Sequence, residues 1–178
     1  GSEMCIRDRL CLMKVGLQLY IAHGKEVLDY LSEQGFEIFL DLKLHDIPNT
    51  VAKAIKEIQK FNIKMTTIHS QGGVEMINAA LDQSNDIKIL AVSLLTSLDK
   101  QDVSRLYDND FEKQFEMLLK VITDTKTHGI VCSSHELVKI SGNNLIKVVP
   151  GIRNVDVSDD QKRICLLYTS DAADDTSG

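Results

Sequence analysis

EIFLDLKLHDIPNT, residues 37–50, is the stretch most informative about the fold, because it joins a strand, a charged strand end and the start of a helix. The first part is a β-rich apolar run, and side chains in a strand alternate between its two faces. Asp41 and Lys43 are therefore expected on one face, and Leu42 and Leu44 on the other. Polar residues at the end of an apolar strand indicate a functional edge of the sheet.

The residues that follow this strand predict a helix. Asp46 is a candidate cap for the helix, and Pro48 suits its first turn, where a missing N–H costs nothing. The helix is expected over 51–61, because apolar residues recur there at spacings of four and three: Val51, Ile55 and Ile58. The stretch thus predicts one complete passage from strand to helix.

The same alternation recurs from residue 10 to residue 164. Strands are expected at 10–20 (with its exit), 37–46, 64–70, 87–97, 129–134 and 145–152. Helices are expected at 24–34, 51–61, 74–83, in a longer region ending near 128, and at 135–140. The strands are near-continuous apolar runs, which is typical of parallel strands buried on both faces. The chain is therefore of the α/β class.

Two α/β architectures compete for this pattern. A doubly wound sheet usually carries a glycine-rich phosphate loop, and neither GxGxxG nor GxxxxGK[ST] occurs here. A (β/α)8 TIM barrel instead places reactive residues at the carboxyl ends of many strands. That arrangement is present at Lys14, Asp41, Lys43, His69, Thr96, Ser97, Ser133, Ser134 and Arg153. We therefore expect a TIM barrel, incomplete because six strands are found instead of eight.

The composition argues against nucleic acid and membrane as partners of this chain. The formal charge is −6 and 43% of the residues are apolar, so the chain lacks the basic footprint of a nucleic-acid-binding protein. No apolar run approaches the ~18 residues that a membrane span needs. Of the four cysteines, Cys5 and Cys165 lie in the atypical ends described below, and Cys11 and Cys132 lie far apart without a Cys/His cluster, so neither a metal site nor a disulfide framework is expected. The cysteine pattern suits a reducing cytoplasm.

The two ends differ from the rest of the chain. Residues 1–9, GSEMCIRDR, lack apolar periodicity, and residues 165–178, CLLYTSDAADDTSG, form a small, polar, acidic tail. Both resemble translated adapter DNA from a sequencing library, so we expect them to be non-native. The barrel domain is accordingly expected over residues 10–164.

The charged row after the second strand suggests a chemistry. Asp41, Lys43 and Asp46 are expected to converge at one strand end, and Lys14 closes the neighbouring strand. Flanking carboxylates favour the protonated ammonium of Lys43, which could then donate a proton. A fixed negative charge would also crowd a substrate carboxylate and favour its departure as carbon dioxide. The motif is short and its residues are common, so taken alone such a row is more often a structural set of ion pairs or a solvated edge.

Three further positions are less specific. Arg153 follows an apolar strand and suits a phosphate, or it is an exposed turn residue. Thr96 offers a hydroxyl for recognition, although helix capping is the commoner role for the Leu95–Ser97 stretch. His69 is expected to be a hydrogen-bonded barrel histidine and not a catalyst.

The stretch FLDLKLHDIPNT resembles the signature of orotidine 5'-phosphate decarboxylases. The similarity continues through LMKVG, HSQGG, LLTSL, GIVCSSHE, VPGIR and DQKRI in the family's order. Sugar-phosphate decarboxylases and synthases of the same superfamily share D-x-K-x-x-D, but they normally continue differently and use magnesium. The resemblance implies conversion of orotidine 5'-phosphate to uridine 5'-phosphate in pyrimidine synthesis, without a cofactor.

The resemblance also implies roles for individual residues. Lys43 would protonate the ring carbon, Asp41 would lie against the substrate carboxylate, and Lys14 would complete the charge network. Asp46 would enter the site of the neighbouring subunit of a homodimer. The substrate contacts would be Asp41, Leu42, Lys43, Leu44, His45, Asp46, Ile47, Pro48, Asn49, Thr50, Thr96, Arg153 and Gln161. Among these, Arg153 would hold the phosphate and Gln161 would close over it.

The family pattern has eight strands, and the six expected here correspond to strands two to seven. Strands one and eight are neighbours in a closed barrel, so two unpaired edges are expected, near 12–20 and 146–152. The chain itself is therefore expected to form an open, C-shaped barrel that is unstable and inactive, with loose ends. Two alternatives are a magnesium-dependent 3-keto-hexulose-phosphate decarboxylase or synthase, and a non-catalytic barrel fragment that binds nucleotide phosphate.

Overall fold

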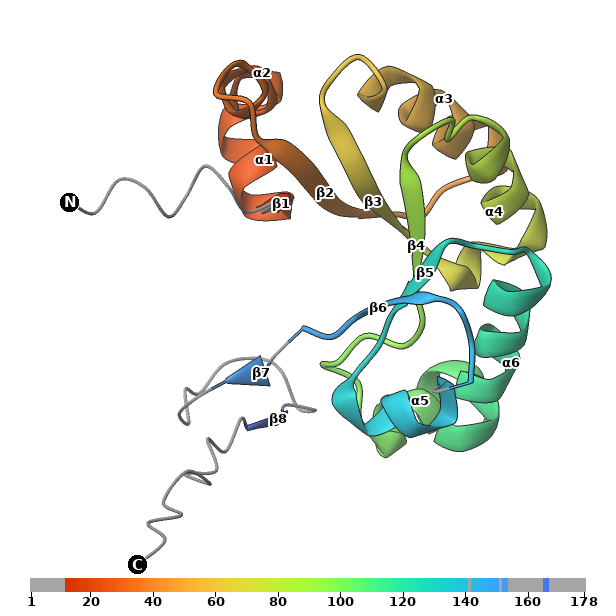
Figure 1. The fold of residues 1–178 in the computed structure, drawn as a ribbon. Helices are drawn as coiled ribbons and strands as arrows, with labels where there is room; N and C mark the ends of the chain where they lie inside the picture. The colour runs from red at the N-terminus through yellow and green to blue at the C-terminus, as the bar shows by residue number, and fades with distance from the viewer. Residues whose placement is uncertain (1–11, 141, 151, 154–164, 167–178) are drawn as a thin grey trace, which may run out of the picture.

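A computed structural model describes residues 12–140 and 142–150, together with the backbone of Ile152–Arg153 and Cys165–Leu166. Its main sheet has six parallel strands in the order β1-β2-β3-β4-β5-β6. They are β1 Leu12–Gly16, β2 Glu37–Leu44, β3 Ile63–His69, β4 Lys88–Val92, β5 Gly129–Val131 and β6 Ile146–Val148. The sheet curls into an open barrel with the helices on its outer side (Figure 1). The expected incomplete TIM barrel is confirmed.

Helices cross over between successive strands, as parallel pairing requires. They are α1 Leu17–His23, α2 Lys25–Glu33, α3 Pro48–Ile58, α4 Gly73–Asp82, α5 Lys100–Tyr107 and α6 Phe111–Asp124, with 3-10 turns η1 Ser70–Gly72 and η2 Ser134–Ile140. The predicted apolar face of α3 is confirmed, since Val51, Ile55 and Ile58 are buried. The longer helical region expected before residue 128 consists of two helices, α5 and α6.

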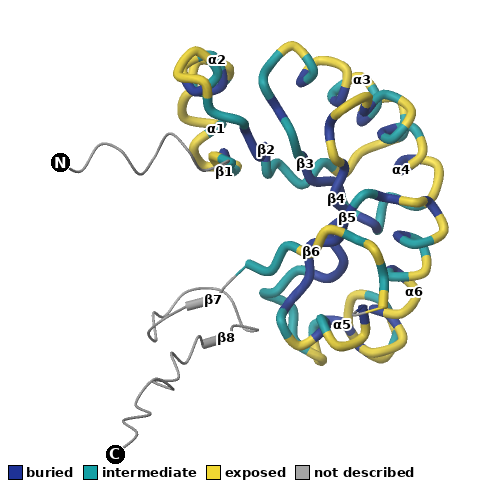
Figure 2. Tube along the Cα trace, viewed as in Figure 1, coloured by how far each residue is buried: buried dark blue, intermediate teal, exposed yellow. Residues whose placement is uncertain are grey.

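Two apolar layers hold the curved sheet together. The larger layer lies between sheet and helices and includes Leu40, Ile55, Ile68 and Phe115. The smaller one contains Phe39, Leu90, Val92 and Val131. Phe39 alternates with Leu40 along β2, so the smaller layer lies on the concave face that Asp41 shares. Buried segments line the inside of the curve and exposed ones its outer rim (Figure 2).

All six predicted strands extend past the observed carboxyl ends, three of them by four residues or more. Residues 17–20 belong to α1, because β1 pairs with β2 only from Leu12 to Gly16. The strand expected over 87–97 ends at Val92, after which the Ser93 backbone N–H and hydroxyl both bond the carbonyl of Val131, at 3.1 and 3.2 Å. The strand expected over 145–152 ends at Val148, shortly before Pro150, whose nitrogen cannot donate to a ladder.

The predicted capping role of Asp46 is wrong. Ile47 is the residue that precedes α3, and its carbonyl accepts the N–H of Thr50 at 3.0 Å. The Asp46 carboxylate instead accepts the N–H of Ile47 at 2.6 Å, so it is engaged before the helix begins. Pro48 does occupy the first turn, as expected.

The C-terminal stretch also departs from expectation. Ile152–Arg153 (β7) pairs in parallel with Cys165–Leu166 (β8), so two residues of the segment expected to be loose form a short strand. An apolar pair such as Cys-Leu satisfies its backbone groups by strand pairing as readily as a native segment. Gly1–Arg9 and residues 167–178 lie outside the described residues, and the assignment of both ends as non-native stays a prediction.

The sheet has two open edges. Within the described strands, β1 pairs with β2 alone and β6 with β5 alone. The expected C shape and its two unpaired edges are therefore confirmed. None of the described helices has the length and apolar character needed to cross a membrane.

Candidate functional site

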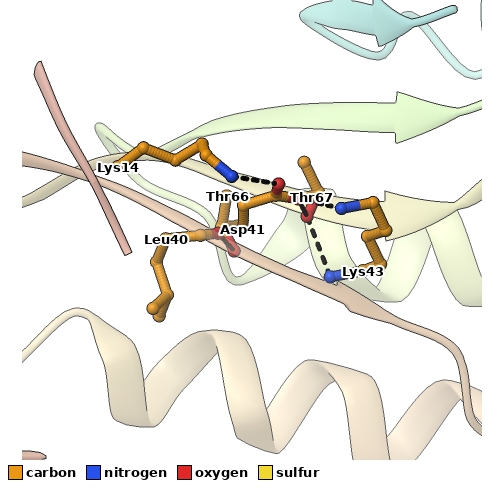
Figure 3. A network of polar contacts seen from close by, with 6 residues as sticks. All are labelled: Lys14, Leu40, Asp41, Lys43, Thr66 and Thr67. Carbon is orange, nitrogen blue, oxygen red and sulfur yellow. Dashed lines mark hydrogen bonds and ion pairs between the residues drawn. The ribbon is translucent and has the colours of Figure 1, made fainter. Parts of the chain in front are cut away.

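Asp41 lies between two lysines at the carboxyl end of β2. Its carboxylate is 3.4 Å from the Lys14 ammonium and 2.8 Å from the Lys43 ammonium. The Asp41 side chain is 12% exposed, whereas those of Lys43 and Lys14 are 30% and 59% exposed. The parallel register of β1 and β2 brings Lys14 near Asp41, because Lys14 is opposite Phe39 and Gly16 is opposite Asp41. Figure 3 shows the resulting row of alternating charges, which joins these three predicted site residues.

A bulge in β2 places Lys43. Leu40 is opposite Thr66 and Leu44 is opposite Ile68. Between these two pairs, β2 therefore contains two more residues than β3. Lys43 takes a φ of 52°, a left-handed conformation that is uncommon outside glycine. Its backbone N–H leaves the ladder and donates to the Thr67 hydroxyl at 2.9 Å.

Thr67 is a site residue that the sequence reasoning did not identify. Its side chain is fully buried, and its hydroxyl donates to Asp41 at 2.9 Å. The available signal was the pair of threonines, Thr66 and Thr67, between the apolar residues Met65 and Ile68 of the same strand. The pattern could not reveal the partner of either threonine, because partners depend on the register between β2 and β3.

The surroundings of Asp41 favour its ionised form. Burial alone would raise the pKa of the Asp41 carboxyl. The hydrogen bond and charge of Lys43, the Thr67 hydrogen bond and the charge of Lys14 outweigh burial and lower the pKa below its usual value. The site therefore holds a fixed carboxylate at neutral pH, with one well-paired and one more exposed ammonium beside it.

Asp46 does not join this row. Among the described residues it forms no ion pair with Lys14 or Lys43, and it is exposed together with Ile47. The expected convergence of the second carboxylate therefore does not occur within one chain.

The leucines of the stretch lie on the other face, as alternation predicted. Leu42 and Leu44 pack against the larger apolar layer. With Leu40 they line a hollow of about 300 Å³ between sheet and helices, bounded also by Tyr20 and Ala54. They therefore do not face the charged row.

Two histidines lie beside the row. The rings of His45 and His69 are 5.3 Å apart between centroids and tilted by 34°. The Nδ1 atom of His69 is buried and has no hydrogen-bond partner among the described residues, so the hydrogen bond expected of this histidine is not found at Nδ1. Burial, followed by the charges of His45 and Lys43, lowers the pKa of His69 to about 4.

The remaining predicted contacts are less well placed. Thr96 lies in a turn four residues after β4 and is partly buried. The capping role considered for this stretch falls to Asp99, which forms a capping box with Asp102 at the start of α5. The Arg153 side chain and Gln161 lie outside the described residues. No three His, Cys, Asp or Glu side chains of the described chain are grouped so as to hold a metal ion.

Parallel strands with outer helices define the chain as a β/α-barrel protein, and the charged row lies at the carboxyl ends of two neighbouring strands, the face that carries the site in barrel enzymes. The Orotidine 5'-phosphate decarboxylase / HUMPS family matches residues 5–174, and the chain belongs to this family.

Several relatives support this membership. An orotidine 5'-phosphate decarboxylase of Ehrlichia canis is 43% identical over 162 residues, which cover 88% of this chain and 71% of the relative. The crystal structure of the Lactobacillus acidophilus enzyme of that name gives a TM-score of 0.71 at 38% identity, covering 79% of this chain and 68% of that one. The Thermotoga maritima structure gives 0.66 at 28% identity, covering 88% and 77%.

Proposed function

We propose that this chain carries the catalytic row of an enzyme that decarboxylates orotidine 5'-phosphate to uridine 5'-phosphate in pyrimidine biosynthesis. The observation that carries the proposal is the Lys14–Asp41–Lys43 row at the strand ends. The relatives with this name, at 36–43% identity, support the substrate. The sugar-phosphate alternative is not favoured, because those relatives are decarboxylases of orotidine 5'-phosphate.

The charged row suits a decarboxylation in which fixed charges destabilise the substrate carboxylate and stabilise the negative charge that develops on the ring carbon. The ionised Asp41 would lie against the substrate carboxylate and destabilise it. The bond between ring carbon and carboxylate then breaks, its electron pair stays on the ring carbon, and carbon dioxide leaves. The Lys43 ammonium stabilises that developing charge and donates its proton to the same carbon. The carboxylate and the ammonium are held 2.8 Å apart before substrate arrives, so little reorganisation is needed.

Residues farther from the ring carbon would supply binding energy. The largest enzymatic accelerations, about 10¹⁷-fold or more, need ~23 kcal/mol of transition-state stabilisation, which one lysine does not provide. Arg153 and Gln161 would hold the phosphate, Thr96 would contact the nucleotide, and Lys14 would touch the ribose. Phosphate binding far from the reaction would then contribute through orientation and closure.

We further propose that the complete enzyme is a cytoplasmic homodimer that needs no cofactor. The exposed Asp46, which lies outside its own chain's row, would enter the site of the second subunit. Cys132 is buried and forms no disulfide among the described residues, which suits a reducing compartment.

The test is to complete the barrel with the first and eighth strands of a close relative and to follow orotidine 5'-phosphate by ultraviolet absorbance. Lys43→Ala removes the proton donor, and Lys56→Ala removes an exposed lysine from α3 as a matched control. We expect turnover that withstands chelator, is retained in Lys56→Ala and falls at least about 1,000-fold in Lys43→Ala. A folded, completed barrel without turnover would contradict the proposal.

A further inference from the structure

Two adjacent threonines of β3 bond β2 in different ways. Thr66 and Thr67 are both fully buried. The Thr66 hydroxyl donates to the backbone carbonyl of Leu40 at 2.9 Å, on the helix side of the sheet. The Thr67 hydroxyl lies on the opposite, concave face, where it meets Asp41 and Lys43. The pair therefore provides a site threonine and a structural threonine next to each other (Figure 3).

The Thr67 hydroxyl serves both members of the catalytic pair at once. A hydroxyl has one proton to donate and lone pairs to accept with. Thr67 gives its proton to the Asp41 carboxylate and accepts the backbone N–H of Lys43, each at 2.9 Å. One buried oxygen atom thus fixes the distance between the Asp41 carboxylate and the backbone of Lys43.

Lys43 needs such a support. A non-glycine residue with a φ of 52° is strained, and this conformation persists only where its surroundings determine it. The bulge removes the Lys43 N–H from the ladder with β3. Thr67 provides the acceptor that the structure gives this N–H in place of a ladder carbonyl.

We propose that Thr67 is a positioning residue for the decarboxylation, holding Asp41 and the strained backbone of Lys43 in their reactive arrangement. The inference rests on the proposed function. Thr67 acts through its two partners and is separated from the ring carbon by them. Its loss would displace the proton donor and the carboxylate together, and small displacements in a preorganised site lower the rate strongly.

The experiment compares three variants of the 178-residue chain. Thr67→Val keeps the shape and removes the hydroxyl, Thr67→Ser keeps the hydroxyl, and Thr66→Val removes the neighbouring buried hydroxyl as the matched control. Hydrogen exchange of the Lys43 amide is followed by NMR and divided by that of the Leu90 amide in β4. This ratio separates a local effect from a general loss of stability.

The expected result is specific to Thr67. The Lys43 amide is protected in the unmodified chain, and its relative exchange rate rises about tenfold in Thr67→Val but not in Thr67→Ser or Thr66→Val. The pKa of Asp41, followed through its ¹³C carboxyl signal, rises in Thr67→Val alone. An unprotected Lys43 amide in the unmodified chain overturns the proposal without any variant, and so does an equal ratio in Thr67→Val and Thr66→Val.

These readouts need no turnover, so they can fail independently of the decarboxylase proposal. In the completed barrel, Thr67→Val is expected to lower kcat by about 10- to 100-fold with little change in KM, and Thr67→Ser to restore it. Unchanged kcat in Thr67→Val, beside a measurable rate in the parent, would overturn the positioning role and leave the decarboxylase intact.

Discussion

At the residue scale, His69 shows how the charged row affects its surroundings. Its ring lies beside that of His45, and its Nδ1 atom is enclosed without a partner among the described residues. Removal from water disfavours the imidazolium ion, and the Lys43 ammonium disfavours it further. His69 therefore stays neutral at pH 7, and the Lys43 cation does not face a second fixed cation there.

The neutral state of His69 predicts how stability depends on pH. The pKa of His69 in the folded chain is about 4, below the ordinary 6.5. Between these two pH values, His69 binds a proton in the unfolded chain but not in the folded chain. Stability therefore falls as the pH falls from 6.5 to 4. Because His69 is partly exposed, we expect about 1–2 kcal/mol. Thermal melting at pH 7 and pH 5 should show this loss in the unmodified chain.

Two variants test whether His69 causes this loss of stability between pH 7 and pH 5. His69→Phe should reduce it, and His23→Gln, at an exposed position on α1, should leave it unchanged. His128, whose pKa burial also lowers, contributes in the same direction, so a remainder is expected. The lowered pKa of Asp41 affects stability only near and below its usual value of 3.8, which lies outside the pH range from 5 to 7. Equal pH dependence in the chain and in His69→Phe would contradict the assignment.

The sequence predicted the charged residues better than their supports. Alternation along β2 was enough to place Asp41 and Lys43 on one face, and parallel neighbours brought Lys14 to them. The left-handed backbone of Lys43 and the partners of Thr67 were not predictable. Both depend on a bulge between β2 and β3, and no local pattern marks the position of that bulge.

At the scale of elements, the pairing of β5 depends on Gly129. A Cβ atom there would come within 2.5 Å of the Ile146 carbonyl oxygen and of a Leu90 methyl group. Only the absence of a side chain allows β6 to approach β5 at this position. The glycine is therefore required by close packing and not by an unusual backbone angle.

Gly129→Ala should accordingly destabilise the chain by about 1–3 kcal/mol, because the backbone of β6 must move away. Gly142→Ala is the matched control, since a Cβ atom there meets nothing within 4 Å. Urea unfolding would measure both. A Gly129→Ala chain as stable as the control would show that β6 is not held closely against β5.

Element types were predictable and element ends were less so. The apolar periodicity of α3 and the order of strands and helices followed from the sequence. The end of β4 at Val92 did not, because Leu94 and Leu95 continue the apolar run after the strand has stopped. The cap at Asp99 was also missed, although the spacing of Asp99 and Asp102 is a capping-box pattern.

At the scale of the whole molecule, the open edges determine behaviour in solution. The outer backbone groups of β1 and β6 lack a strand partner within the described sheet. Apolar side chains are exposed near both edges, among them Met13, Leu17 and Ile146. Exposed edges with apolar neighbours favour association between chains.

We therefore expect the 178-residue chain to self-associate and to lack turnover, whereas the completed barrel remains a discrete species. Light scattering at increasing concentration and the ultraviolet assay would test this expectation. A monodisperse chain with measurable decarboxylation would contradict it. The open shape was predictable from the count of strands, whereas the β7–β8 pair was not, because it involves a tail that showed no strand pattern.

The spatial order of the six strands is identical to their order along the chain. Each new strand therefore pairs with the strand synthesised immediately before it, and this pairing needs no segment that is synthesised much later. Such a barrel can assemble vectorially during synthesis, one strand and helix at a time, with every new unit templated by the last. The charged row therefore reaches one open edge, because Lys14 lies in β1, while Asp41 and Lys43 lie in β2, far from the second open edge at β6.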